Sequence, residues 1–311
     1  MTSANVIILK NANSDVLLCP DIGAAIARYT WRGHSVLRPA PDSAIEQGLV
    51  RQMGAYALMP YSNRIARAKL VVGDKIYVLR QNFPPELHAV HGFGWQRAWQ
   101  VLTSSVDSVR LTLRHAADSD WPFACEAKQH IQLSADGLRL TISVCNLDDA
   151  PMPAGLGFHP FFPTIPAAKL QAEWKGMWKM DAESLPAEWV ETPASADFRQ
   201  LRAVEGWKVD NCFTGWGRQA VLEYPTHRTT IEASSNCRQL ICYAPDDGRN
   251  FMALEPVSHI NDGFNLAAKG VADTGMQLLG RGDSMEISMT VSMQEMLPNN
   301  GTGKDGKSKN D

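Results

Sequence analysis

Residues 130–144, HIQLSADGLRLTISV, contain two stretches of alternating apolar and polar residues, separated by Asp136-Gly137. Alternation with a period of two places the apolar side chains on one face of a strand and the polar side chains on the other. An Asp-Gly pair between two such stretches is typical of a tight hairpin turn. This segment therefore predicts two antiparallel strands with one buried face and one face in water.

The same pattern recurs along much of the chain. VRLTLR (residues 109–114) and MEISMTVSM (residues 285–293) alternate in the same way, and Gly73-Asp74 separates KLVV from KIYVL. Long amphipathic helical patterns are scarce, because 18 prolines and 23 glycines interrupt most windows. The alternation of strands and helices typical of a doubly wound nucleotide-binding fold does not occur. We therefore expect an all-β protein built as a large antiparallel β-sandwich.

The expected sandwich covers residues 1–296 as a single domain. No change in composition marks a linker in this range, and strand patterns continue on both sides of the proline-rich stretch PMPAGLGFHPFFPTIP (residues 151–166). After Leu297 the chain is polar and rich in glycine, without apolar residues that could anchor it. We expect residues 297–311 to form a disordered polar tail.

Charge, hydropathy and cysteine content exclude several classes of protein. The chain has 30 Lys and Arg against 33 Asp and Glu, and no segment concentrates basic residues between aromatic ones, so we expect no nucleic-acid partner. No apolar run approaches the roughly 18 residues that span a bilayer, and no signal peptide is evident. Six cysteines without a C-x-x-C pair indicate reduced core residues. We expect a cytoplasmic monomer or homodimer with no membrane partner.

Five short stretches combine ionisable residues with glycine, proline or aromatic residues in a way that building strands alone does not require. They are MPYSNRIARA (59–68), ELHAVHGFGW (86–95), GLGFHPFFP (155–163), VDNCFTGW (209–216) and ALEPVSHINDGFN (253–265).

The third and fifth stretches contain candidate acid and base groups. His159 lies among two glycines, three phenylalanines and two prolines, and such a partly dry setting depresses the pKa of an imidazole. The alternative is a packed histidine bonded to a backbone carbonyl. Glu255 follows the apolar run FMAL, which predicts a buried strand ending at a proline, and its carboxylate is either an ion-pair partner or a general base. Asp262-Gly263 and His259 indicate a turn and a loop.

The remaining stretches offer polar groups that could bind hydroxyls. Asn63 and Arg64 are suited to hydroxyls or a carboxylate, although a structural salt bridge of Arg64 is an alternative. Asp210 lies beside Phe213 and Trp216, and polar groups beside flat rings are typical of a sugar site, because C–H faces stack on aromatic rings. The alternative for Asp210 is an Asx-type turn.

The two imidazoles of His88 and His91 also raise the question of a metal site. A pair spaced i,i+3 shares a face only on a helix, and Pro84-Pro85 and Gly92 make a long helix here improbable. In a strand the two rings point to opposite faces. A chelate of two histidines is therefore disfavoured, while a mononuclear site built from dispersed ligands stays open as an alternative.

In their order and content, these stretches resemble the aldose 1-epimerase (galactose mutarotase-like) family. The resemblance rests on Asn-Arg-Ile in SNRI, Val-His-Gly in AVHGFGW, GFHPFFP, the Asp of DNCF and the Glu of ALEP, which together span residues 59–265. It implies the galactose mutarotase-like supersandwich fold over nearly the whole chain. It further implies that Glu255 is the general base and His159 the general acid, that Arg64, His91 and Asp210 hold the sugar, and that Asn63 supports Arg64.

The resemblance also implies an activity, the interconversion of the α and β anomers of an aldohexose by ring opening and reclosure. This chemistry requires no metal, nucleotide or other cofactor. We expect His91 to contact the sugar, His88 to be structural, and Gly92 and Gly94 to let the backbone approach the ligand. Whether Trp95 and Trp216 line the pocket stays open.

Three alternatives to a simple hexose epimerase remain. A non-catalytic carbohydrate-binding β-sandwich would use the same aromatic pocket without chemistry. A glycosidase would need two carboxylates beside the scissile bond, and Asp210 is the only acid besides Glu255 that we single out as a candidate in these stretches. An epimerase of a modified or phosphorylated sugar is the third, although no basic cluster beyond Arg64 and Arg67 is evident near the motifs.

Overall fold

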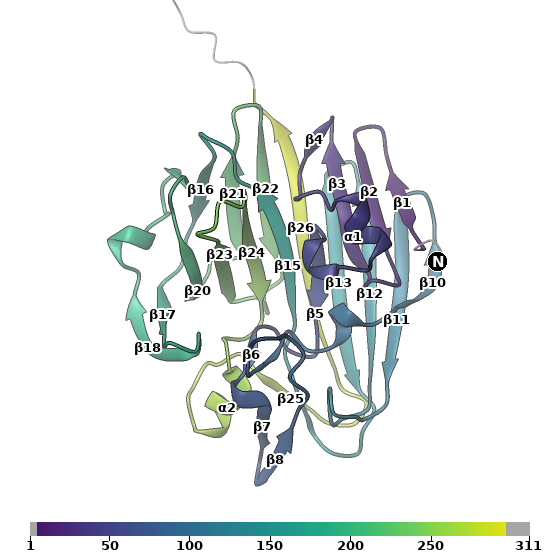
Figure 1. Ribbon diagram of the computed structural model, residues 1–311, viewed down its shortest axis with the longest axis vertical. Helices are drawn as coiled ribbons and strands as arrows, with labels where there is room; N and C mark the ends of the chain where they lie inside the picture. Colours follow the sequence, from purple (N-terminus) through teal and green to yellow (C-terminus); the bar gives the residue numbers. More distant parts are fainter. Residues whose placement is uncertain (1–4, 297–311) are drawn as a thin grey trace, which may run out of the picture.

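The structure is a computed structural model that describes residues 5–296, so the expected tail at residues 297–311 lies outside the described residues. Two large antiparallel sheets face each other across the molecule (Figure 1). The fold is therefore the antiparallel all-β sandwich that the alternating sequence pattern predicts. No helix within residues 5–296 is both long and apolar enough to cross a bilayer.

The first sheet has eleven strands and carries the candidate site. In spatial order its strands are β1 (Ile7–Lys10), β2 (Ser14–Cys19), β3 (Ala25–Trp31), β5 (Ala55–Leu58), β15 (Gly157–Pro163), β24 (Phe251–Val257), β23 (Gln239–Ala244), β20 (Val209–Thr214), β17 (Gly176–Met180) and β18 (Pro186–Glu191), with β4 (His34–Ser35) paired to β3.

The second sheet has nine strands and lies behind the first. In spatial order they are β10 (Gln100–Ser104), β11 (Ser108–His115), β12 (Cys125–Ser134), β13 (Gly137–Asn146), β26 (Ser284–Glu295), β22 (His227–Ala233), β21 (Gln219–Glu223), β16 (Lys169–Ala172) and β19 (Arg202–Ala203).

Smaller elements connect and cover the two sheets. Three two-stranded ribbons pair β6 (Arg64–Ile65) with β9 (Ala89–Val90), β7 (Lys69–Val72) with β8 (Lys75–Val78), and β14 (Met152–Ala154) with β25 (Gln277–Leu279). The α-helices of the described chain are single short turns, α1 (Asp42–Glu46) and α2 (Gly263–Ala268). Short 3₁₀ segments include η1 (Val50–Gln52), η2 (Ala66–Ala68), η3 (Gly94–Gln96) and η4 (Ala194–Ala196).

The hairpin predicted from residues 130–144 is present, with its turn displaced by one residue. β12 and β13 pair from Cys125 opposite Asn146 to Ser134 opposite Gly137, so Ala135 and Asp136 form the turn and Gly137 begins the second strand. Gly137 has a φ of 140°, and a Cβ there would lie 2.3 Å from the carbonyl oxygen of Val291 on the neighbouring strand β26. This glycine is therefore required by the close approach of β26.

Two apolar clusters lie on opposite faces of the eleven-stranded sheet. The larger one fills the space between the sheets and takes side chains from both, among them Phe158, Phe162 and Leu254. The smaller one lies on the other face and includes Tyr56, Phe161 and Phe251, among others. Because successive side chains of a strand point to opposite faces, the central strands of this sheet are buried on both sides.

All six cysteines are free, and five of them are buried. They occupy strand or core positions, as the sequence analysis predicts. Glu255 and Pro256, in contrast, lie inside β24, which continues to Val257, so the prediction that the strand ends at this proline was wrong. Pro256 is tolerated because it falls where the pairing between β24 and β15 is interrupted.

Replacing Gly137 by Ala should lower the free energy of unfolding by about 2–4 kcal/mol, because the new Cβ meets a backbone oxygen and the φ is strained. The matched control is Gly73→Ala in the β7–β8 hairpin, where φ is 57° and nothing lies within 4 Å of the added Cβ. The control should lose only about 1–2 kcal/mol, the cost of the left-handed conformation. Urea denaturation measures both, and equal losses would contradict the role given to β26.

Candidate functional site

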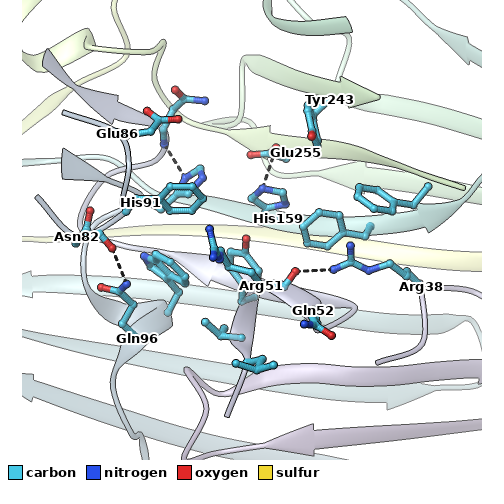
Figure 2. A pocket seen from close by; sticks show the side chains of 18 of the residues that line it. Arg38, Arg51, Gln52, Asn82, Glu86, His91, Gln96, His159, Tyr243 and Glu255 are labelled. Atoms are coloured by element: carbon cyan, nitrogen blue, oxygen red, sulfur yellow. Dashed lines mark hydrogen bonds and ion pairs between the residues drawn. The ribbon is translucent and has the colours of Figure 1, made fainter. Parts of the chain in front are cut away.

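A cavity of about 860 Å³ opens on the face of the eleven-stranded sheet that points away from the second sheet (Figure 2). All six site residues expected from the sequence line it, although they come from five separate stretches of the chain. They are Asn63, Arg64, His91, His159, Asp210 and Glu255.

Strand register places His159 beside Glu255. In the pairing of β15 with β24, Gly157 lies opposite Val257 and Phe161 opposite Ala253, which sets His159 opposite Glu255 on the same face. On the other side of β15, Tyr56 of β5 is the direct partner of His159. The cavity floor is thus a row of side chains at right angles to the strands.

The ladder between β15 and β24 is interrupted at this pair. Cα partners are assigned at Gly157 and again from Phe161, but not between them. Pro160 and Pro256 lie in or beside the interval, and neither has an N–H group to donate to a ladder. The prolines in HPF and LEP therefore mark the place where the two strands present their ionisable side chains.

The His159–Glu255 pair is almost completely buried. His159 Nε2 lies 3.3 Å from Glu255 Oε1, and the residues are 7% and 2% exposed. The other polar atoms, His159 Nδ1 and Glu255 Oε2, are buried without a hydrogen-bond partner among residues 5–296. The imidazole stacks on the ring of Phe161 at 4.4 Å between centroids. Buried polar atoms are normally satisfied, so two orphaned atoms in one cavity indicate that a ligand completes them.

Burial disfavours charge on both members of the pair. It raises the pKa of Glu255 well above 4.5, and the negative charge of Asp210 raises it further. Burial also lowers the pKa of His159 well below 6.5, with added repulsion from His91 and Arg38. The sequence analysis expects a lowered pKa for His159, and the pKa is indeed lowered, below the range in which an acid or base works at neutral pH. Burial thus favours the uncharged form of the pair, in which the proton is on Glu255.

Arg64 forms the structural salt bridge that the sequence left as an alternative, and it also lines the cavity. Its Nε and Nη2 donate to the two carboxylate oxygens of Glu86 at 2.8 and 2.7 Å, and its side chain is mostly buried in the cavity wall. Its Nη1 also donates to Asn63 Oδ1 at 3.2 Å. The bidentate ion pair fixes the guanidinium plane, so Glu86 is a positioning residue that the sequence analysis did not single out.

His91 is held in one orientation by Asn63. The backbone N–H of Asn63 donates to His91 Nδ1 at 3.0 Å, and the backbone N–H of His91 donates to the carbonyl of Asn63 at 2.8 Å. Burial, together with the charge of Arg64, lowers the pKa of His91 to about 3, so the ring is neutral. Because Nδ1 accepts a hydrogen bond, the proton is on Nε2, and His91 offers a donor there.

Asp210 lies within strand β20, opposite Tyr243 of β23, and not in the Asx-type turn that the sequence left as an alternative. Its side chain is exposed to the cavity. The next residue, Asn211, donates to the carbonyl of Trp178 at 2.9 Å and points away into the sheet. Asp210 is therefore the carboxylate of the strand that faces the cavity.

The two tryptophans of the motifs have different places. Trp95 lines the cavity, stacks on Tyr56 and donates from Nε1 to the carbonyl of Gly92 at 3.2 Å. Trp216 is buried outside the cavity lining, where its Nε1 donates to the carbonyl of Gln219. The flat wall of the cavity is thus Trp95.

The expectation that Gly92 and Gly94 let the backbone approach a ligand was wrong. Neither lines the cavity. A Cβ on Gly92, whose φ is 65°, would lie 1.9 Å from the carbonyl oxygen of Met59, and one on Gly94 would lie 2.5 Å from the sulfur of Met59. Both glycines are required by the packing of this loop against Met59.

His88 is structural, as expected, and does not form a pair with His91. Its Nδ1 accepts a hydrogen bond from the backbone N–H of Arg67 at 3.0 Å, and its Nε2 lies 3.1 Å from the carbonyl of Glu183. Within residues 5–296, no group of three or more His, Cys, Asp or Glu side chains is arranged to hold a metal ion.

Asp262 and His259 support backbone near the cavity. Asp262 lies in a turn, as expected, directly before helix α2, and its Oδ1 accepts from the backbone N–H of Ala66 and from Asn265. His259 Nε2 accepts from the backbone N–H of Ser62, the residue before Asn63. Their roles are to hold the segment that carries Asn63 and Arg64.

The expectation of no basic cluster beyond Arg64 and Arg67 was also wrong. Arg67 pairs with Glu183 and is not among the lining residues. Three other arginines line the cavity, Arg38, Arg51 and Arg249. They belong to none of the five stretches, and only the folded chain brings Arg249 to the same cavity as Arg38 and Arg51.

Comparisons with known proteins identify the family and the fold of the chain. A family model described as aldose 1-epimerase matches residues 5–292. The chain is 31% identical over 281 residues to the uncharacterized protein YphB of Escherichia coli K12, covering 87% of this chain and 93% of that protein. A crystal structure from Escherichia coli K12 titled "Putative aldose 1-epimerase" superposes with a TM-score of 0.85 at 26% identity, covering 94% and 99% of the two chains.

A galactose mutarotase-like protein from Clostridium acetobutylicum superposes with a TM-score of 0.84 at 21% identity and covers 94% of this chain and 96% of its own. At this identity the likeness concerns the fold. It establishes that the sandwich is of the galactose mutarotase-like type.

Replacing Glu255 by Gln should flatten the dependence of stability on pH. Because the folded pKa of Glu255 is raised, the wild type loses stability as pH rises from the unfolded value of 4.5 through the folded value. The slope reaches about 1.4 kcal/mol per pH unit, and a neutral amide removes it. Urea denaturation of both proteins across this range gives the two profiles.

The control for this prediction is Glu188→Gln, which removes an exposed carboxylate paired with Lys179. Its profile should run parallel to that of the wild type. If the Glu255→Gln profile is parallel as well, Glu255 does not carry a raised pKa in the folded protein.

Proposed function

The chain belongs to the aldose 1-epimerase family, whose members act on sugars, and from this premise we propose that it is an isomerase that interconverts the α and β anomers of an aldohexose. The observation that carries the proposal is the buried His159–Glu255 pair, with one unsatisfied polar atom on each side chain. A cavity of about 860 Å³ with one flat aromatic wall is large enough for a hexose.

The chemistry requires two proton transfers at one carbon. Opening the ring removes the proton from the C1 hydroxyl, protonates the ring oxygen O5 and breaks the C1–O5 bond, leaving an aldehyde at C1. Rotation about C1–C2 and closure on the other face then give the other anomer. Both oxygens are bonded to C1, so the acid and the base must lie side by side, as His159 and Glu255 do.

In the proposed mechanism Glu255 is the general base and His159 the general acid. With sugar bound, the pair reacts as carboxylate and imidazolium, which together carry the same single proton as the neutral pair. Glu255 takes the proton of the C1 hydroxyl while His159 gives its proton to O5, and ring closure reverses both transfers. Ring opening thus leaves the neutral pair that burial favours, so the dry site stabilises the route to the open-chain form.

Arg64, His91 and Asp210 are proposed to hold the hydroxyls of the sugar, with Asn63 supporting the Arg64 side. Arg64 is fixed by Glu86 and His91 by Asn63, so both donors are oriented before substrate arrives. The positive charge of Arg64 also lowers the pKa of Glu255 and so favours its carboxylate form. The reaction needs no cofactor in this mechanism.

Two rival functions make different use of the same cavity. A carbohydrate-binding protein would gain nothing from burying an ionisable pair with unsatisfied atoms, because each such atom costs about 1–3 kcal/mol of stability. A glycosidase needs two carboxylates facing each other across a bond, whereas the partner of Glu255 is an imidazole. We therefore place the epimerase first, and we propose a role in carbohydrate metabolism in the cytoplasm, which the free cysteines support.

Glu255→Gln and His159→Asn should each slow anomer exchange by about 10²–10⁴-fold while leaving the fold intact. Polarimetry on freshly dissolved α-D-glucose and α-D-galactose measures the rate, and circular dichroism checks the fold. His88→Asn changes an imidazole outside the cavity and should keep the wild-type rate. Near-wild-type exchange in either catalytic variant would refute the assignment, and sugar binding by the wild type without faster exchange would favour the carbohydrate-binding alternative.

A further inference from the structure

The two ends of the cavity differ in charge. At one end Arg64 is neutralised by Glu86, and Asp210 adds a further carboxylate. The other end holds Arg38 and Arg249, while Arg51 lies on the rim over Phe83, a ring that packs against His91 and Trp95. These three arginines are called the arginine cluster. Figure 2 shows Glu86 and Arg38 on opposite sides of His159. A cavity that only had to bind neutral hydroxyls would not require this excess of positive charge.

Arg38 is the innermost member of the cluster and has no carboxylate partner among residues 5–296. Its guanidinium lies over the rings of Phe161 and Phe251, at 3.9 and 4.4 Å from their centroids. Its Nη2 donates to the backbone carbonyls of Arg51 and Met53, while its Nε is buried without a partner within the described chain. The charge is thus held rigidly, and one of its donors is unused.

The other two arginines add to the positive potential. The guanidinium of Arg249 lies 5.0 Å from the centroid of Phe251, a ring that Arg38 also covers. Arg249 pairs with Asp247. Arg51 lies over Phe83 at 4.8 Å, with no carboxylate of the described residues paired to it. Burial lowers the pKa of Arg38 to about 10, and the charge of Arg249 contributes to that shift, yet Arg38 stays cationic at neutral pH.

The position of the cluster relative to the reacting pair decides which part of a sugar it would meet. Phe161 stacks between His159 and Arg38, so Arg38 lies one ring beyond the acid. His91 and Arg64 lie on the other side of His159. In a pyranose, C1 is flanked by C2 on one side and by O5 and C5 on the other. With the C2 and C3 hydroxyls toward Arg64, the substituent on C5 points toward Arg38 and Arg249 of the arginine cluster.

We propose that the preferred substrate is an aldose with an anionic group on its C5 side, a phosphate ester or a carboxylate at C6, bound by the arginine cluster. This inference rests on the proposed epimerase function and narrows its substrate class. Guanidinium groups bind phosphate and carboxylate oxygens with charge-assisted hydrogen bonds, and the unused Nε of Arg38 offers such a donor.

The test compares enzymatic anomer exchange of glucose, glucose 6-phosphate and glucuronate, measured by NMR exchange spectroscopy after the uncatalysed rate of each sugar is subtracted. For at least one of the two anions, kcat/KM should exceed the kcat/KM of glucose by about 10-fold or more. A single charge-assisted hydrogen bond to the anionic group is sufficient for this difference. The anion with the higher kcat/KM, glucose 6-phosphate or glucuronate, shows whether a phosphate or a carboxylate is the group that is bound.

Variants assign this preference to the cluster. Arg249→Gln and Arg51→Gln should each lower the ratio of kcat/KM for the anion to kcat/KM for glucose by about 5–10-fold. They are preferred to changes of Arg38, because Arg38 also holds the backbone of Arg51 and Met53. The matched control is Arg67→Gln, an arginine outside the cavity paired with Glu183, which should leave the ratio unchanged.

The possible failures are distinguishable. If glucose is turned over and neither anion exceeds it, the inference is overturned while the epimerase function stands. If an anion is preferred but both variants keep the wild-type ratio, the arginine cluster is not its site and the inference is overturned. If no sugar exchanges faster than without enzyme, the proposed function fails and this inference fails with it.

Discussion

The structure depends on the placement of one imidazole and one carboxylate side by side in a nearly dry cavity. His159 and Glu255 come from neighbouring strands, β15 and β24, and the register of these strands alone sets them opposite each other. Burial makes both charged forms unfavourable, so it favours the uncharged pair with its proton on Glu255. A pair of this kind can give a proton to one oxygen while taking a proton from its neighbour.

The residues around the pair differ between its two sides. On one side Glu86 and Asn63 orient Arg64 and His91, whose donors face the cavity. On the other side Phe161 separates the pair from Arg38. In the function that we propose, the hydroxyls of the sugar bind on the first side of the pair and an anionic group binds on the second.

The sequence predicts the fold well because period-two alternation and turn residues are local properties. The hairpin at residues 130–144 is recovered to within one residue. The motifs also predict which of their residues share a cavity. Residues outside them were missed, because Arg38 and Arg249 meet only through strand order, and no local pattern around them signals a site. The glycines of HGFG were misjudged for the same reason, since their contact with Met59 is tertiary.

The protonation state of Glu255 tests the central claim most directly. In protein labelled with ¹³C at the glutamate δ-carbon, the Glu255 signal is the one absent from Glu255→Gln. The account predicts that this signal titrates with a transition well above 4.5, the ordinary value for a glutamate. A transition near 4.5 would show that burial does not raise the pKa of Glu255 and would contradict the account.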